Sequence, residues 1–156
     1  MIQTIPFRKK VALAREAAKA ALVFFALNAI WEVAQIPLYT LWRQGSWQEI
    51  TIALVHCTVG DLLIGVTVAA VSAGALRLLT KSYPKLVPST FLSVFLVIGI
   101  GYTVFSEWLN VHALATWTYT DQMPVVPPFG TGLTPLLQWL IVPTLTYAFL
   151  ARRRSS

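Results

Sequence analysis

The sequence has little charge and almost no cysteine. Only 12% of its 156 residues are charged and 56% are hydrophobic, whereas about a quarter of the residues of a soluble domain are charged. This composition excludes an ordinary soluble domain. Cys57 is the only cysteine, so an intrachain disulfide is impossible and the redox compartment is left open. We interpret Cys57 as a packed thiol, with a thiolate ligand as the alternative.

Two further absences narrow the function. The sequence has no internal repeat, which argues against a transporter built from inverted halves. It also has no E-x-x-H motif, because Glu107 is followed at i+3 by Asn110 and at i+5 by His112. The metal-binding helix pairs of carboxylate bundles use that motif. The sequence therefore favours no metal and no cofactor.

Long apolar runs are what the sequence does have. A helix of about 20 apolar residues crosses the roughly 30 Å of a bilayer's hydrocarbon core, and backbone groups in lipid must bond within their own segment. We therefore predict an all-α integral membrane protein, a four-helix transmembrane bundle forming one domain over residues 20–151. The predicted spans are about 20–41, 50–76, 90–110 and 133–151.

Basic residues are confined to the ends of these spans. Eleven of the 12 Lys and Arg residues lie before the first span, between the second and third, or after the fourth, and only Arg43 lies elsewhere. The positive-inside rule then places both termini in the cytoplasm, with residues 1–19 as a basic interfacial lead-in and 152–156 as a basic tail. Such a distribution does not fit nucleic-acid binding. The first span lacks a small-residue cleavage site, so we expect no cleaved signal peptide.

Three carboxylates lie inside the predicted spans: Glu32, Asp61 and Glu107. Each would cost about 2.5–3.5 kcal/mol at the centre of a lipid-facing helix, so together they predict an internal polar site. Asn28, Glu32 and Gln35 follow the i, i+4, i+7 spacing of one helix face. Counted by helical rise, the polar side chains lie near the midplane or on the external side.

Acid–base chemistry on a lipidic or isoprenoid substrate is the leading hypothesis for this site. Glu32 and Glu107 are the predicted acid–base pair, with His56 and Asp61 as partners that tune it. A separation of five residues puts His56 and Asp61 about 140° apart on one helix, so one of them is expected to face another way. The predicted substrate-binding residues are Trp31, Gln35, Trp108, Asn110, Trp117, Tyr119 and Gln138.

Two alternatives stay open. A metal or haem could bind through His56 and His112, which have similar predicted depths. The polar groups could also only fix helix packing, in an accessory or assembly subunit of a larger membrane complex or in a homo-oligomer.

The segment of residues 112–132 has no Lys or Arg but several aromatics. We predict that it forms an ordered external cap over the site, with an interfacial aromatic belt as the alternative.

Five segments carry a resemblance: NAIWEVAQIPLY, HCTVGDLLIG, YTVFSEWLNV, WTYTDQMP and PLLQWLIVP. Together they resemble a group of small four-span bacterial inner-membrane proteins, over about residues 28–143. The resemblance implies a location in the bacterial inner membrane and implies no activity. The architecture is also loosely similar to that of the emopamil-binding sterol isomerases, whose motif spacing the chain does not reproduce.

Overall fold

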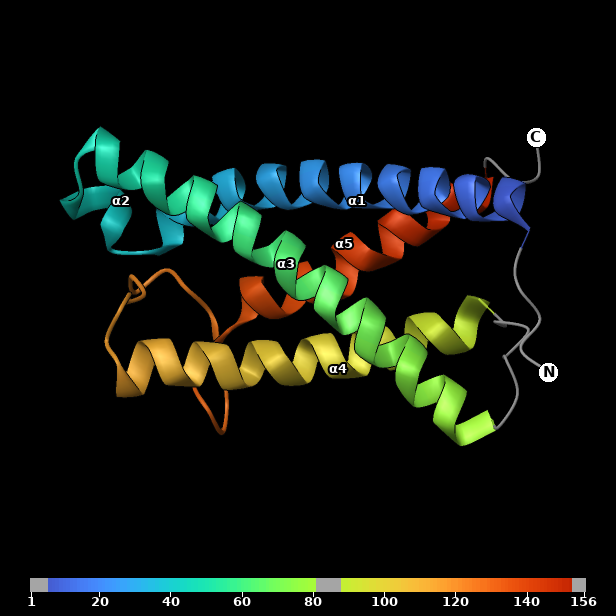
Figure 1. Cartoon of the computed structure of the whole chain (residues 1–156). Helices are drawn as coiled ribbons and strands as arrows, with labels where there is room; N and C mark the ends of the chain where they lie inside the picture. Colours follow the sequence, from blue (N-terminus) through green and yellow to red (C-terminus); the bar gives the residue numbers. More distant parts are fainter. Residues whose placement is uncertain (1–5, 81–87, 153–156) are drawn as a thin grey trace.

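The computed structural model describes residues 6–80 and 88–152 of the chain, which are almost entirely helical (Figure 1). Four helices in this part of the chain are long and apolar enough to cross a membrane. They confirm the prediction of a helical, multi-pass membrane protein. The candidate spans are Phe7–Leu38, Trp47–Leu79, Ser89–Ala113 and Leu133–Arg152. Four of the basic residues used for the orientation, Lys81, Lys85, Arg153 and Arg154, lie outside the described residues.

The first long helix, α1 (Phe7–Gln35), runs without a break through the predicted boundary at residue 19. Its sequence is rich in Ala and contains no Gly or Pro, so nothing in it favours a bend. The basic lead-in is therefore the first part of the same helix. Pro37 follows directly, and the chain continues as a short 3₁₀ turn, η1 (Ile36–Leu38), because proline cannot extend the α-helical hydrogen-bond ladder.

The second long helix, α3 (Trp47–Thr80), follows the four-residue helix α2 (Leu41–Gln44). It starts with a capping box. The Ser46 backbone N–H donates to Glu49 Oε2 at 2.7 Å, and the Glu49 N–H donates to Ser46 Oγ at 3.3 Å. These bonds satisfy backbone donors that a helix end leaves without partners.

The remaining elements are α4 (Pro88–Trp108), a π-helical turn η2 (Leu109–Ala113), strands β1 (Val125–Val126) and β2 (Thr131–Gly132), and α5 (Leu133–Arg152). The strands pair antiparallel, Val125 with Gly132 and Val126 with Thr131. Helix α1 packs against α3 and α5, and α4 packs against the same two helices. In Figure 1 the start of α1 and the end of α5 lie at the same end of the molecule.

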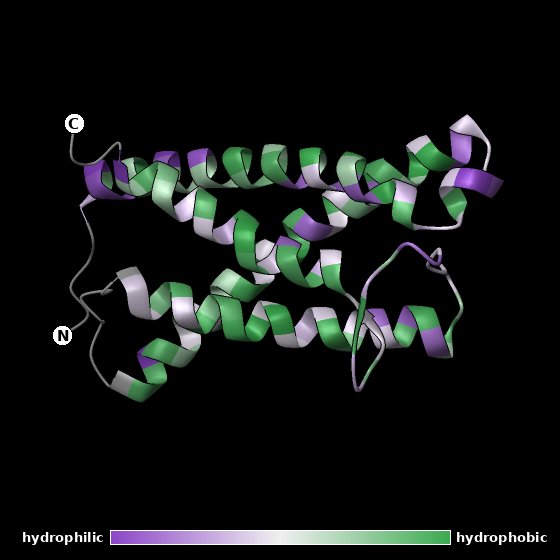
Figure 2. Ribbon diagram, turned by 180° about the vertical axis from the view of Figure 1, so that it is seen from behind, coloured by the Kyte–Doolittle hydropathy of each residue, from purple (hydrophilic) through white to green (hydrophobic). Residues whose placement is uncertain are grey.

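The helices meet in a small aromatic and aliphatic core made of Phe24, Val68, Phe95, Trp139 and Val142. Glycines permit the close approach: a Cβ on Gly65 would lie 2.6 Å from the Phe24 ring, and one on Gly99 would lie 2.5 Å from the Trp139 ring. Many apolar side chains point outward instead, including Leu22, Ile30 and Val97. Figure 2 shows apolar residues along the middle of the helices and polar ones mostly toward their ends, as expected for helices that face lipid.

Candidate functional site

Gln138 of α5 is the centre of a buried polar cluster. Its Nε2 lies within hydrogen-bond distance of three oxygens: Asn28 Oδ1 at 2.9 Å, Glu32 Oε1 at 2.8 Å and Asp61 Oδ2 at 2.8 Å. These partners come from α1 and α3, so one amide joins three of the four long helices. The side chain is only 3% exposed. We call Asn28, Glu32, Gln35, Asp61 and Gln138 the Gln138 cluster.

Helix α1 supplies one side of the cluster through the polar helix face that the sequence predicts. Asn28, Glu32 and Gln35 are all buried, as their i, i+4, i+7 spacing predicts. Gln35 Nε2 donates to Glu32 Oε1 at 2.8 Å and to Gln138 Oε1 at 3.2 Å. Trp31 approaches from the edge, where its indole N–H donates to Gln35 Oε1 at 3.1 Å. Glu32 Oε1 thus accepts from two different amides.

A second polar group forms around Glu107, near the end of α4. The carboxyl group is buried and accepts a hydrogen bond from the Tyr119 hydroxyl. The backbone N–H of Gly132 in turn donates to the Tyr119 oxygen at 3.0 Å. The buried indole N–H of Trp117 lies beside Glu107 without reaching full hydrogen-bond geometry. Burial and the neighbouring Glu107 raise the pKa of Tyr119, so its hydroxyl stays protonated at neutral pH and acts as the donor.

The segment that carries Tyr119 is hydrogen-bonded to the turn that follows α1. The Thr40 N–H donates to the Thr118 carbonyl at 3.0 Å, and the Thr120 N–H donates to the Leu38 carbonyl at 2.9 Å. The rings of Tyr39 and Tyr119 meet edge to face, with centroids 5.4 Å apart. Glu107 and Glu32 are close enough to interact electrostatically, so the Glu107 group lies near the Gln138 cluster.

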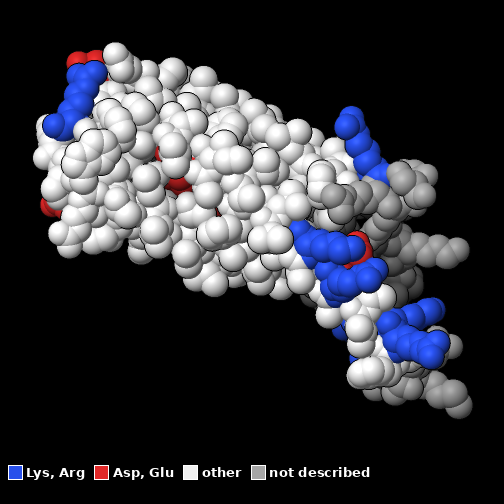
Figure 3. All heavy atoms as spheres, turned by 90° about the horizontal axis from the view of Figure 1, so that it is seen from above, with Lys and Arg blue, Asp and Glu red and all other residues white. Residues whose placement is uncertain are grey.

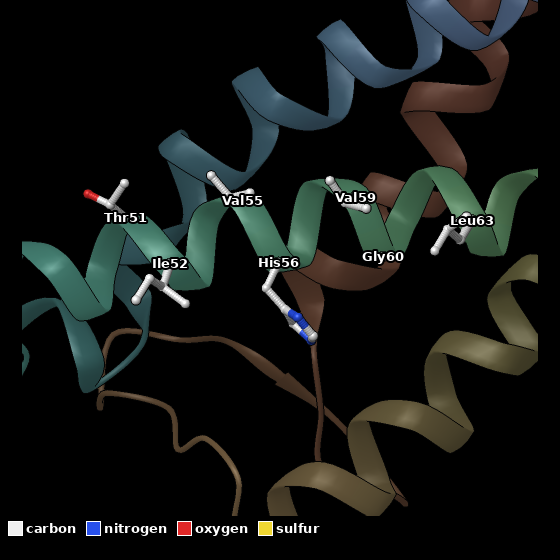
Figure 4. A pocket seen from close by; sticks show the side chains of 7 residues that line it. All are labelled: Thr51, Ile52, Val55, His56, Val59, Gly60 and Leu63. Carbon is white, nitrogen blue, oxygen red and sulfur yellow. The ribbon is translucent and has the colours of Figure 1, made fainter.

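His56 stays apart from both groups. It is exposed, and it lines a groove of about 480 Å³ whose seven lining residues all belong to α3. Figure 4 shows its ring projecting away from α3, on the opposite side of the ribbon from Val59. A groove lined by one helix is a surface feature rather than an enclosed site. Asp61 faces the interior and His56 does not, which agrees with their expected angular separation.

Other predicted residues lie at the margin. The Asn110 amide donates to the Ser106 carbonyl of its own helix at 2.8 Å. Trp108 is 44% exposed. His112 is exposed beside Gly130, where an added Cβ would lie 2.9 Å from its Nε2. Among the described residues, no three His, Cys, Asp or Glu side chains are grouped to hold a metal ion.

Sequence reasoning did not assign a role to Phe24 and Phe95, which pack against Trp139 beside the Gln138 cluster. Phe24 meets Phe95 and Trp139 edge to face, with ring centroids 6.5 and 6.2 Å apart, while Phe95 and Trp139 stack at 6.1 Å. Phenylalanines are common in apolar helices, so the sequence does not distinguish Phe24 and Phe95 from the others. Only the way the helices cross shows that these two rings lie beside the cluster. No protein-family model, curated protein or solved structure matches this chain.

Proposed function

We propose that this protein is a membrane-embedded acid–base enzyme that moves protons on carbon–carbon double bonds of an apolar lipid. The Gln138 cluster carries the proposal, because it holds two carboxyl groups from different helices against one amide inside a membrane protein. Ionisable groups kept at such a depth are costly and usually functional. Glu32 and Asp61 are the proposed proton donor and acceptor, in place of the pair Glu32 and Glu107 favoured by the sequence.

The closeness of the two carboxyl groups supports a proton shared by this pair. Three oxygens, from Asn28, Glu32 and Asp61, lie at hydrogen-bond distance from Gln138 Nε2, but an amide nitrogen carries only two hydrogens. The third oxygen takes its hydrogen from another group, as Glu32 Oε1 can from Gln35 Nε2. The carboxyl groups of Glu32 and Asp61 are close enough to interact, and two neighbouring carboxylates are stabilised by one proton held between them. Such a proton is ready for transfer.

The proposed reaction balances without a co-reactant. A carboxyl O–H bond breaks as its proton bonds to one alkene carbon, which leaves a carbocation on the adjacent carbon. A neighbouring C–H bond then breaks, its electron pair forms the new double bond, and the second carboxylate takes the proton. The result is an isomerised lipid. Phe24, Phe95 and Trp139 lie nearby, and aromatic ring faces stabilise a transient cation.

The proposal includes the arrangement in the membrane. We place the four spans as a bundle in the bacterial inner membrane, with both termini in the cytoplasm and the Tyr119 segment outside. Figure 3 supports this orientation, because Lys and Arg side chains gather mainly at one end of the elongated molecule. Positive charge marks the cytoplasmic side of a membrane protein.

Deuterium exchange tests the activity. Membrane vesicles containing the protein are incubated in D₂O with squalene, phytol or oleic acid, and the extracted lipid is analysed by mass spectrometry. We expect deuterium to enter at least one of these lipids with the wild type, and to be lost in Glu32→Gln and Asp61→Asn. Asp121→Asn is the matched control, because Asp121 is exposed. Equal exchange in all four proteins, or none in the wild type, would refute the proposal.

A second candidate is a non-catalytic role, in which the Gln138 cluster only fixes the crossing of α1, α3 and α5. It is favoured by the fact that the Gln138 amide joins α5 to α1 and α3 by hydrogen bonds. In that case Glu32→Gln would change stability and leave any associated membrane complex functional. The same variants therefore separate the two functions.

A further inference from the structure

A hollow of about 360 Å³ lies between all four long helices. Phe24 of α1, Gly65 of α3, Phe95 of α4 and Pro143 of α5 line it. The volume falls in the lower part of the range of ligand pockets, about 300–1,000 Å³. The hollow also reaches the outer surface, because one of its lining residues, Val66, is 57% exposed. In a membrane that surface faces lipid.

The wall of this hollow is apolar. Among the lining residues only Thr146 and Tyr147 carry a side-chain hydroxyl, and Thr146 Oγ1 already donates to the Val142 carbonyl at 2.8 Å. Much of the remaining wall is Ala, Gly, Leu and Phe. A lipid headgroup would lose its hydration here without gaining partners. The hollow therefore suits hydrocarbon.

The hollow ends beside the Gln138 cluster. Phe24 lines it, and the Phe24 carbonyl accepts a hydrogen bond from Asn28 Nδ2 at 2.8 Å. Gly65 lies one helical turn after Asp61, about 6 Å along the axis. Phe95 stacks on Trp139, the residue next to Gln138. The hollow and the Asp61 carboxyl group are thus about one helical turn apart along α3.

We propose that the hollow binds the end of an acyclic, unsaturated hydrocarbon chain and so sets the substrate class of the proposed enzyme. The volume of the hollow decides between an acyclic hydrocarbon chain and the fused rings of a sterol. A protein cavity of about 150 Å³ holds one benzene molecule, so this hollow has room for roughly a dozen carbon atoms. The fused rings of a sterol need more space than that. This inference rests on the proposed function, but binding can be measured without turnover.

Native mass spectrometry of the whole protein, with farnesene as the acyclic probe and cholesterol as the ring probe, tests the inference. Ala69 lines the hollow and Ala70 is exposed on the same helix. We expect the wild type to bind farnesene in preference to cholesterol. Ala69→Phe should weaken farnesene binding at least tenfold and Ala70→Phe should leave it unchanged. If Ala69→Phe does not fold, the pair Ala17→Phe and Ala18→Phe decides, because Ala17 lines the hollow at an exposed position.

The outcomes separate this inference from the proposed function. No farnesene binding in the wild type, preference for cholesterol, or equal binding in Ala17→Phe and Ala18→Phe would overturn the hollow as the chain site. If binding follows the expected pattern while no lipid exchanges deuterium, the hollow stands and acid–base catalysis fails. If Ala69→Phe loses farnesene binding but keeps deuterium exchange, catalysis stands and the hollow is not its substrate site.

Discussion

The two halves of the helical body solve the problem of helix packing in opposite ways. In the half that carries the Tyr119 segment, helices are joined by side-chain hydrogen bonds around Gln138. In the other half they meet through small residues and rings, with Gly65 against Phe24, and leave a hollow. The hydrogen bonds specify which helices pair with each other, whereas the small residues and rings specify how closely the helices approach. A site that moves protons on hydrocarbon needs both environments next to each other.

The largest effect is expected where one side chain serves three helices. Gln138→Leu removes the two hydrogen bonds that Nε2 can donate and the one that Oε1 accepts from Gln35. At about 0.6–1.7 kcal/mol per bond, this loss should lower the free energy of unfolding by about 2–5 kcal/mol. Unfolding by SDS in mixed micelles measures this. Gln48→Leu, at an exposed position of α3, should change little. Equal stability of the two variants would show that the Gln138 cluster does not hold the helices together.

The next effect tests the apolar half. A methyl group at Gly65 would lie 2.6 Å from the Phe24 ring, so Gly65→Ala forces that ring to move and should cost about 1–3 kcal/mol. Gly60→Ala on the same helix meets nothing within 4 Å, and it should stabilise the helix by up to about 1 kcal/mol. The same SDS titration compares them, and a stabilising Gly65→Ala would contradict the close packing.

An effect of similar size, but confined to one segment, is expected at Tyr119. Tyr119→Phe removes the hydroxyl that donates to Glu107 and accepts from the Gly132 N–H. The expected cost is about 1–3 kcal/mol, since buried partners lose their bonds. Cleavage of residues 114–132 by a protease reports local opening. Tyr102→Phe, at a tyrosine that is 42% exposed, is the control. Similar cleavage of both variants would show that the Tyr119 hydroxyl does not hold the segment in place.

The smallest effect should come from His56. Its side chain is exposed on one face of α3, so His56→Ala is expected to change stability by less than about 0.5 kcal/mol and to leave deuterium exchange unchanged. A loss of deuterium exchange in this variant, with stability unchanged, would show that His56 belongs to the catalytic site, as the sequence predicted.

Much of the site could be expected from residue types and spacing. Glu32 and Gln35 had to face the interior, because a carboxyl and an amide on one stripe of a membrane span need partners. Asp61 and Gln138 were expected at the site for the same reason. Their pairing was not, since helix spacing says which residues share a face and nothing about which face meets which. His56 illustrates this, because its spacing from Asp61 allowed only one of them to face the interior.

The sequence by itself determined the four apolar spans, the concentration of basic charge and the positions of the carboxyl groups along the spans. These follow from hydropathy and helical rise, which are local properties. Only the tertiary structure decided that Gln138 bridges Asn28, Glu32 and Asp61, that Tyr119 reaches Glu107 and that an apolar hollow lies beside them. Those contacts join residues far apart in the chain, and they depend on helix crossings that no local pattern encodes.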